Sequence, residues 1–291
     1  MVSRIRRLEI DRIAEEVVAD VAALPIEPRS IATERQITIQ TWEPKVQGIS
    51  GFLMKQGDSF GIGYSAKIKN PGFVNFTLGH ELGHYHLPGH IEKLFASGSG
   101  IHSSRSGFVS GDECEREADL FAATLLMPER LFRAALRTAG QGFPAIEALS
   151  ARCVTSITAT AIRFAAFVED PVAVIVSSNG NVEYCCLSPA IREIGGITNL
   201  RRGDSLPTTS TTARFQEEPD NIINGCRAEG CSILDEWLEG APPVEMKEDV
   251  VGLGHYGKSL TVLFSGEPVE ADDPDEDEDS YEHSQQWERQ G

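Results

Sequence analysis

The chain has 291 residues, of which 41% are hydrophobic and 24% charged, so it is long enough to bury a core and to form more than one domain. Its formal net charge is −18, but residues 267–291 carry −10 of this, and the remaining chain is only mildly acidic. An acidic surface repels phosphate, so we expect no direct DNA binding. The first residues are charged and no apolar run is long enough to cross a bilayer, which predicts a cytoplasmic protein without a membrane partner.

The amino-terminal part of the chain predicts a helix followed by strands. Apolar residues recur at three-to-four spacing over about 4–24, which indicates an amphipathic helix ended by Pro25. Alternating apolar residues and glycines over 37–62 indicate strands, including a hairpin. Helical spacing resumes over 73–87 and stops at Pro88. The first half is therefore expected to place strands before a central helix.

The next segments predict a loop, more helices and a strand-rich end. Residues 97–111 are rich in Gly and Ser and are expected to form a loop, after which Asp112 can cap a helix that runs to about residue 126. Residues 129–168 have helical spacing with a break at 140–142. The turn Asn179-Gly180 lies between two apolar segments and predicts a β-hairpin. The six cysteines lack a zinc-binding or secreted-scaffold spacing, so we expect free thiols.

The run His80-Glu81-Leu82-Gly83-His84 lies in the expected central helix. Two histidines four residues apart project from one face of a helix, so both imidazoles can bind one metal ion. Glu81 is one residue away from His80 and can take a proton from a water molecule held by the metal. The short run alone also arises by chance, so a third ligand farther along the chain is needed to support a metal site.

Four side chains are candidates for that third ligand: Glu115, Glu117, His86 and His90. We favour Glu115, because it shares a helix face with three apolar residues and has Asp119 one turn farther on, where a ligand histidine could donate a hydrogen bond. Glu117 and His90 remain alternatives, and His86 points away from the other histidines. We interpret four side chains as exposed: His86, His90, Glu113 and His102.

Two segments together resemble a known family. Residues 76–84 read Phe-Thr-Leu-Gly-His-Glu-Leu-Gly-His, and residues 115–128 read Glu-Arg-Glu-Ala-Asp-Leu-Phe-Ala-Ala-Thr-Leu-Leu-Met-Pro. The pair closely resembles the ImmA/IrrE family of minigluzincin metallopeptidases over about 30–130, less clearly to 168, and faintly beyond. The resemblance implies an α+β, gluzincin-like zinc peptidase fold, with Glu115 as the third ligand beside His80 and His84, and Glu81 as the general base.

The family resemblance also implies a function. We expect a zinc-dependent endopeptidase that cleaves a helix-turn-helix transcriptional repressor or antitoxin, relieving repression in a stress response, a mobile element or a toxin–antitoxin-like system. Zn²⁺ is the expected cofactor, with Mn²⁺ as a replacement. The alternative is a regulatory binding protein that captures the repressor without cutting it, but a structural metal site has no use for the base Glu81.

The substrate is expected to lie extended along a strand edge between Gly51 and Tyr64. Tyr85 or His90 is expected to stabilise the oxyanion. Four parts are expected along the chain: a zinc metallopeptidase domain over 1–130, a helical helix-turn-helix-like module over 131–170, a small strand-rich domain in the place of a sensor domain over 171–266, and a disordered acidic tail over 267–291.

Overall fold

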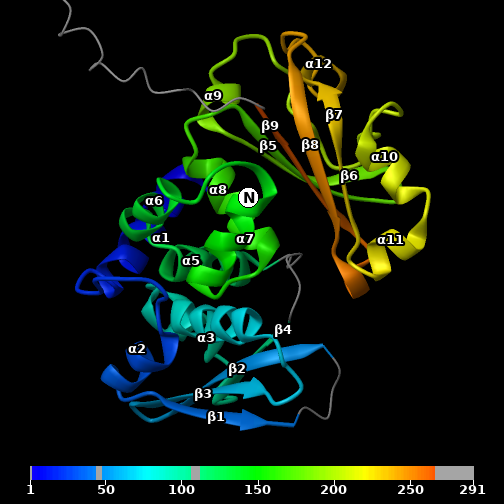
Figure 1. Cartoon of the computed structure of the whole chain (residues 1–291). Coiled ribbons are helices and arrows are strands. Elements are labelled where there is room, and N and C mark those ends of the chain that lie inside the picture. Colours follow the sequence, from blue (N-terminus) through cyan, green and yellow to red (C-terminus); the bar gives the residue numbers. More distant parts are fainter. Residues whose placement is uncertain (1, 44–47, 106–111, 266–291) are drawn as a thin grey trace, which may run out of the picture.

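The computed structural model describes residues 2–43, 48–105 and 112–265, so the expected acidic tail over 267–291 lies outside the described residues. Within them the chain forms two sheets with a layer of helices between them (Figure 1). The mixed α+β composition expected from the sequence is confirmed. No helix in the described ranges combines the length and apolarity needed to cross a bilayer.

The first sheet lies below the central helix in Figure 1 and has the strand order β1-β3-β2-β4. β1 runs parallel to β3, and the other neighbours are antiparallel. Its strands are β1 (Thr38–Trp42), β2 (Ile49–Gln56), β3 (Ser59–Ser65) and β4 (Ile101–Arg105). Because β2 and β3 both lie inside the sheet, the edges belong to β1 and β4.

Two sequence expectations about this sheet are wrong. The segment 97–111 is not all loop, since 101–105 pairs with β2, with Ile101 opposite Met54. The pairing joins residues about 50 positions apart, so local Gly and Ser content does not reveal it. The residues between Gly51 and Tyr64 therefore offer no free edge, because β4 covers β2 and β1 covers β3.

Five helices accompany the first sheet: α1 (Arg4–Val17), α2 (Pro28–Glu34), α3 (Pro71–His86), α4 (His90–Leu94) and α5 (Glu113–Leu126). The side chain of Asn70 caps α3 by accepting from Phe73 N at 3.0 Å, and Asp112 caps α5 by accepting from Cys114 N at 2.8 Å. The cap expected at Asp112 is confirmed. These caps fix where the two helices that carry the candidate His and Glu ligands begin.

The first helix is shorter than the expected range 4–24, because it ends at Val17. Val18 is 2% exposed and leaves the helix, and the chain then turns. Val21 and Leu24 still pack against the core from this non-helical segment. The apolar spacing therefore reflects burial rather than a continued helix.

The helices after α5 confirm the expected break at 140–142, where Gly140 and Gly142 adopt positive φ. They are α6 (Glu129–Leu136), α7 (Gly142–Cys153) and α8 (Ile157–Phe167). α7 and α8 pack against each other and are joined by a short turn at Val154, which is left-handed. α8 has no exposed residue, because it also packs against β5 and β6 of the second sheet.

The second sheet is antiparallel with the order β6-β5-β9-β8-β7. Its strands are β5 (Val172–Ser178), β6 (Asn181–Leu187), β7 (Arg227–Ile233), β8 (Glu245–Gly252) and β9 (Ser259–Phe264). Short helices and one 3-10 turn connect them: α9 (Pro189–Arg192), α10 (Thr211–Gln216), α11 (Pro219–Ile223), α12 (Leu234–Trp237) and η1 (Gly254–Tyr256). Asn179 and Gly180 both have positive φ, so the expected β5–β6 hairpin is confirmed.

Two large apolar cores meet at α5. One packs α1, α3 and α5 against β2 and β3, and it includes Leu125. The other includes Leu126 and packs α6, α7 and α8 against one face of β5 and β9. This second core crosses the expected boundaries near 130 and 170, and the division into domains remains a prediction.

Candidate metal centre

The candidate site lies where α3 and α5 pack closely together. A Cβ atom on Gly83 would lie 3.1 Å from Ala118 Cα, and one on Gly79 would lie 3.3 Å from Ala122 Cβ. Small residues on both helices therefore let the two backbones approach. The close packing brings the histidines of α3 and the acidic residues of α5 within hydrogen-bond distance of one another.

The structure brings His80, His84 and Glu115 together. One ligand atom from each lies within 4.8 Å of the others. The Nε2 atoms of His80 and His84 are 3.1 Å apart, and the Glu115 carboxylate oxygens lie 3.4 Å from His80 Nε2 and 3.2 Å from His84 Nε2. Two imidazole nitrogens and one carboxylate oxygen thus converge on one point.

This donor set fits a zinc ion. Tetrahedral zinc bonds imidazole nitrogen and carboxylate oxygen at about 2.0–2.2 Å, which places the donors roughly 3.3 Å apart. The separations above have this size. The outer nitrogen of His80, Nδ1, lies 2.8 Å from Asp119 Oδ1, so Nδ1–H donates to that carboxylate and the proton on Nε2 is the one that a metal would displace. The hydrogen bond expected between a ligand histidine and Asp119 is confirmed.

The pKa values of the three groups are shifted in different directions. Burial lowers the pKa of His80, but hydrogen bonds to Asp119 and Glu115 outweigh burial and raise it to about 10. Burial lowers the pKa of His84 to about 3 despite its bond to Glu115. Burial opposes the charge of Glu115, yet its bonds from His102, His80 and His84 hold its pKa far below the usual range. Glu115 is therefore ionised, as a carboxylate ligand must be.

Glu81 lies beside this cluster and is fully buried. Neither of its carboxylate oxygens has a hydrogen-bond partner within the described residues. Burial raises its pKa to about 7, and the positive charge of His80 opposes the shift. A buried carboxyl group without a partner costs folding free energy, so its position next to the metal donors indicates a chemical role.

His90 and Glu117 lie next to the cluster but outside its centre. His90 is 2% exposed, so its interpretation as an exposed side chain is wrong. Its Nδ1 lies 3.0 Å from His84 Nδ1, on the side of that ring away from Glu115, and its Nε2 lies 3.0 Å from Glu117 Oε2. Sequence spacing placed His90 past the end of the helix. It did not show that α4 begins at His90 and turns the ring inward.

His102 is the site residue that the sequence analysis missed. It lies on β4, its side chain is only 20% exposed, and its Nε2 is 2.9 Å from Glu115 Oε1. Its ring centroid is 4.9 Å from that of His84. The sequence analysis expected a loop over 97–111, so it gave no reason to place His102 next to the metal donors. Of the other side chains interpreted as exposed, Glu113 is exposed, whereas His86 is partly buried and stacks on Phe121.

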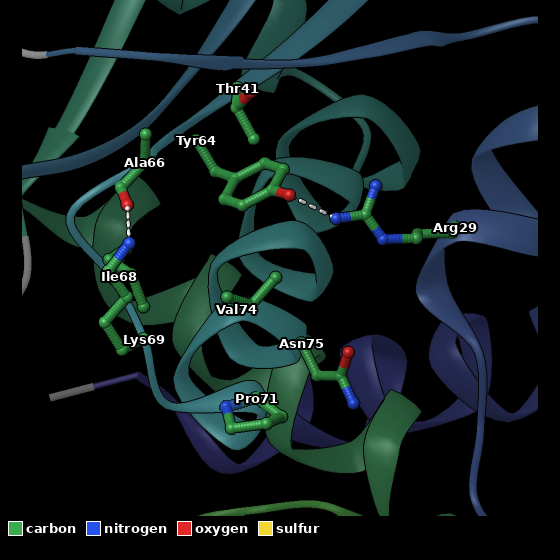
Figure 2. A pocket seen from close by; sticks show the side chains of 9 residues that line it. All are labelled: Arg29, Thr41, Tyr64, Ala66, Ile68, Lys69, Pro71, Val74 and Asn75. Atoms are coloured by element: carbon green, nitrogen blue, oxygen red, sulfur yellow. Dashed lines mark hydrogen bonds between the residues drawn. The ribbon is translucent and has the colours of Figure 1, made fainter.

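A separate hollow of about 400 Å³ lies near the first turn of α3, away from the cluster (Figure 2). None of the four predicted site residues lines it. Its polar side chains already bond within the protein: Arg29 to the Tyr64 hydroxyl, and Lys69 Nζ to Ala66 O at 3.1 Å. The hollow therefore lies outside the candidate metal centre.

Among known proteins, the chain resembles one solved structure and one family model. One solved structure, described as a Mycobacterium tuberculosis transcriptional regulator, superposes with a TM-score of 0.53 at 14% identity, covering 90% of this chain and 77% of that chain. This likeness concerns the fold alone. No curated protein matches the chain. Residues 45–152 match the family model described as Peptidase M78, IrrE N-terminal-like domain. The resemblance to the ImmA/IrrE family that the paired segments predict is therefore confirmed over residues 45–152.

Proposed function

We propose that the chain is a zinc-dependent endopeptidase of gluzincin-like fold, with a helix-turn-helix transcriptional repressor or antitoxin as its substrate. The observation that carries the proposal is Glu81, a fully buried carboxylate without a partner in the described residues, beside three convergent metal donors. A structural metal site has no use for such a base. A peptidase needs one, because water must lose a proton as it attacks the peptide carbonyl.

His80, His84 and Glu115 would hold the metal. When bound, zinc supplies a Lewis acid at which water has a pKa of about 7. Two imidazoles and one carboxylate suit zinc better than manganese, which prefers oxygen donors. Glu81 accepts the proton of the attacking water and returns it to the leaving amine. Asp119 keeps the His80 ring in the tautomer that presents Nε2.

The edge strand β4 is the part of the structure suited to hold the substrate. Among the described strands it pairs only with β2, so its outer backbone groups can pair with an extended peptide. His102 on this strand lies against Glu115, so a peptide added to β4 would pass the metal donors. We therefore propose β4, instead of a strand edge between Gly51 and Tyr64, as the substrate-binding edge.

His102 is also the better candidate for stabilising the oxyanion. Both nitrogens of His90 are engaged, by His84 and by Glu117. The ring of Tyr85 packs edge-on against Phe60 in the apolar core. His102 is partly buried on the side of the cluster from which a peptide would approach. Its Nε2 faces Glu115 Oε1, so its Nδ1 could donate to the carbonyl oxygen when both ring nitrogens carry a proton.

The repressor substrate and the link to a stress response, mobile element or toxin–antitoxin-like system rest on the family resemblance, whereas the cytoplasmic location remains a prediction from the sequence. The proposal does not include direct DNA binding, because α8 has no exposed residue to enter a groove. A peptide must be extended to pair with β4, so we expect cleavage in a linker of the repressor or in a segment that unfolds locally.

The test compares the wild-type protein with Glu81→Gln, both loaded with zinc and incubated with a helix-turn-helix repressor encoded beside the gene. Wild-type protein should cut the repressor once, and mass spectrometry of the fragments should locate the cut. Glu81→Gln should bind zinc and the repressor but leave the repressor intact. Relief of repression by both forms without any cut would instead show a capture protein.

A further inference from the structure

A buried chain of hydrogen bonds leads from the candidate ligand His84 to the amino-terminal helix. His84 Nδ1 lies 3.0 Å from His90 Nδ1, and His90 Nε2 lies 3.0 Å from Glu117 Oε2. Arg6 on α1 donates to the same Oε2 through Nη2 at 2.6 Å and through Nε at 3.0 Å. His84 is fully buried, and His90 and Glu117 are 2% and 5% exposed, so water does not compete strongly for these bonds.

The direction of each bond follows from one requirement. If His84 Nε2 offers its lone pair to a metal, Nδ1 must carry the proton and donate it to His90 Nδ1. His90 is then the tautomer protonated on Nε2, and it donates to the Glu117 carboxylate. Glu117 accepts this bond and both bonds from Arg6. Every donor has an acceptor, and reversing any link would leave two donors or two acceptors facing each other.

We infer that His90 and Glu117, anchored by Arg6, are positioning residues that hold the His84 imidazole in the orientation and tautomer needed for metal binding. This inference rests on the proposed metal site and adds to it. His80 has Asp119 as its outer partner, and His84 has the His90–Glu117–Arg6 chain in the same role. Arg6 lies on α1, outside the matched range 45–152. The inference therefore gives the amino-terminal helix a role in supporting the metal centre.

The chain offers matched variants for a test. His90→Phe removes both nitrogens. Arg6→Met removes both guanidinium donors, and Glu117→Gln weakens the outer links by removing the charge of the acceptor; neither variant touches a ligand. His90→Asn places an amide oxygen near the position of Nδ1, so it can still accept from His84. His86→Phe is the control, because His86 is also a partly buried histidine next to α5 but lies outside this chain of bonds.

Two readouts separate positioning from folding. Zinc affinity is measured by competition with a chromophoric chelator, and the visible spectrum of the Co²⁺-loaded protein reports the geometry at the metal. We expect His90→Phe to lose about 10- to 100-fold in zinc affinity, the range for outer partners of metal ligands, and to change the Co²⁺ spectrum. Glu117→Gln and Arg6→Met should also lower the zinc affinity and change the Co²⁺ spectrum, but by less than His90→Phe does. His90→Asn should recover most of the affinity, and His86→Phe should match the wild type.

The outcomes distinguish this inference from the proposed function. Wild-type protein that binds no zinc would overturn the metal site and, with it, the positioning role. Zinc bound normally by the wild type, with unchanged affinity and Co²⁺ spectrum in His90→Phe and Glu117→Gln, would overturn the positioning role alone. If His90→Phe does not fold, Glu117→Gln and Arg6→Met decide the matter, because thermal unfolding shows whether each is folded before metal is added.

Discussion

Gly51 on β2 lies directly against Glu81 on α3: a Cβ atom on Gly51 would come within 2.8 Å of Glu81 Oε1 and 2.6 Å of the Thr77 methyl group. Real Cβ atoms essentially never show such contacts. The sheet therefore covers the proposed base so closely that only glycine fits above it. This contact contributes to the complete burial of Glu81.

The first prediction follows from this contact. Gly51→Ala should force β2 away from α3 or turn the Thr77 and Glu81 side chains, since the added methyl would meet both of them and also Gly63 O at 3.3 Å. We expect a loss of about 1–3 kcal/mol in the free energy of unfolding, as for other overpacked sites. Urea unfolding of the protein measures it.

Gly61→Ala is the matched control in the same sheet. Its added methyl would meet only the Met54 methyl group at 3.3 Å and Thr38 O at 3.6 Å. Met54 is flexible and 40% exposed, so it can move aside. Equal unfolding curves for Gly51→Ala and the wild type would show that the sheet does not press on Glu81.

A second prediction concerns the third ligand. Glu115→Gln replaces a charged oxygen donor by a neutral amide and also removes the carboxylate that pairs with His102. Zinc affinity should fall by more than about 100-fold, beyond the range for outer partners of ligands. Metal analysis of the purified variant and chelator competition measure the loss.

Glu113→Gln serves as its control, because Glu113 is exposed in the first turn of the same helix. It should bind zinc like the wild type. Full zinc in Glu115→Gln combined with complete loss in His90→Ala would move the third ligand to His90, which the sequence analysis left open.

The sequence predicted those parts of the fold and of the site that depend on short-range geometry. The spacing of His80 and His84 on one helix face, the helix cap at Asp112 and the Asn179-Gly180 turn each follow from a few neighbouring residues. The inward turn of His90 and the place of His102 depend on contacts with residues far away in the chain. β4 is defined by its pairing with β2, and the residues of 101–105 alone show no pattern that predicts this pairing.

The cysteines give a third prediction, since all six are free. Cys226 and Cys231 are exposed, whereas Cys153 is fully buried among α7 and α8 and burial raises its pKa to about 11. At pH 8 only about one part in a thousand of such a thiol is ionised. A chromogenic disulfide reagent should modify two thiols quickly and Cys153 only after urea unfolding. Fast reaction of Cys153 in the folded protein would contradict the packing of α7 on α8.

The last prediction concerns Glu248, a fully buried carboxylate in the second sheet that has no part in the metal site. It accepts hydrogen bonds from Thr211 N at 3.0 Å, from Thr212 N at 2.6 Å and from Thr212 Oγ1 at 2.7 Å, and also from the Ser232 hydroxyl. The two backbone donors belong to the first turn of α10, which has no intrahelical acceptors for them. The carboxylate thus joins α10 to β8 and β7.

Glu248→Gln should therefore destabilise the protein, because the amide nitrogen would face hydrogen-bond donors and the charge that strengthens these bonds is lost. We expect a loss of about 1–3 kcal/mol in the free energy of unfolding, whereas Glu245→Gln on the exposed side of the same strand should cost less than about 0.5 kcal/mol. Zinc affinity should be unchanged in both variants, since helices lie between α3 and β8, the strand that carries Glu248 (Figure 1). A fall in zinc affinity in folded Glu248→Gln would show instead that the second sheet is coupled to the metal centre through α7 and α8.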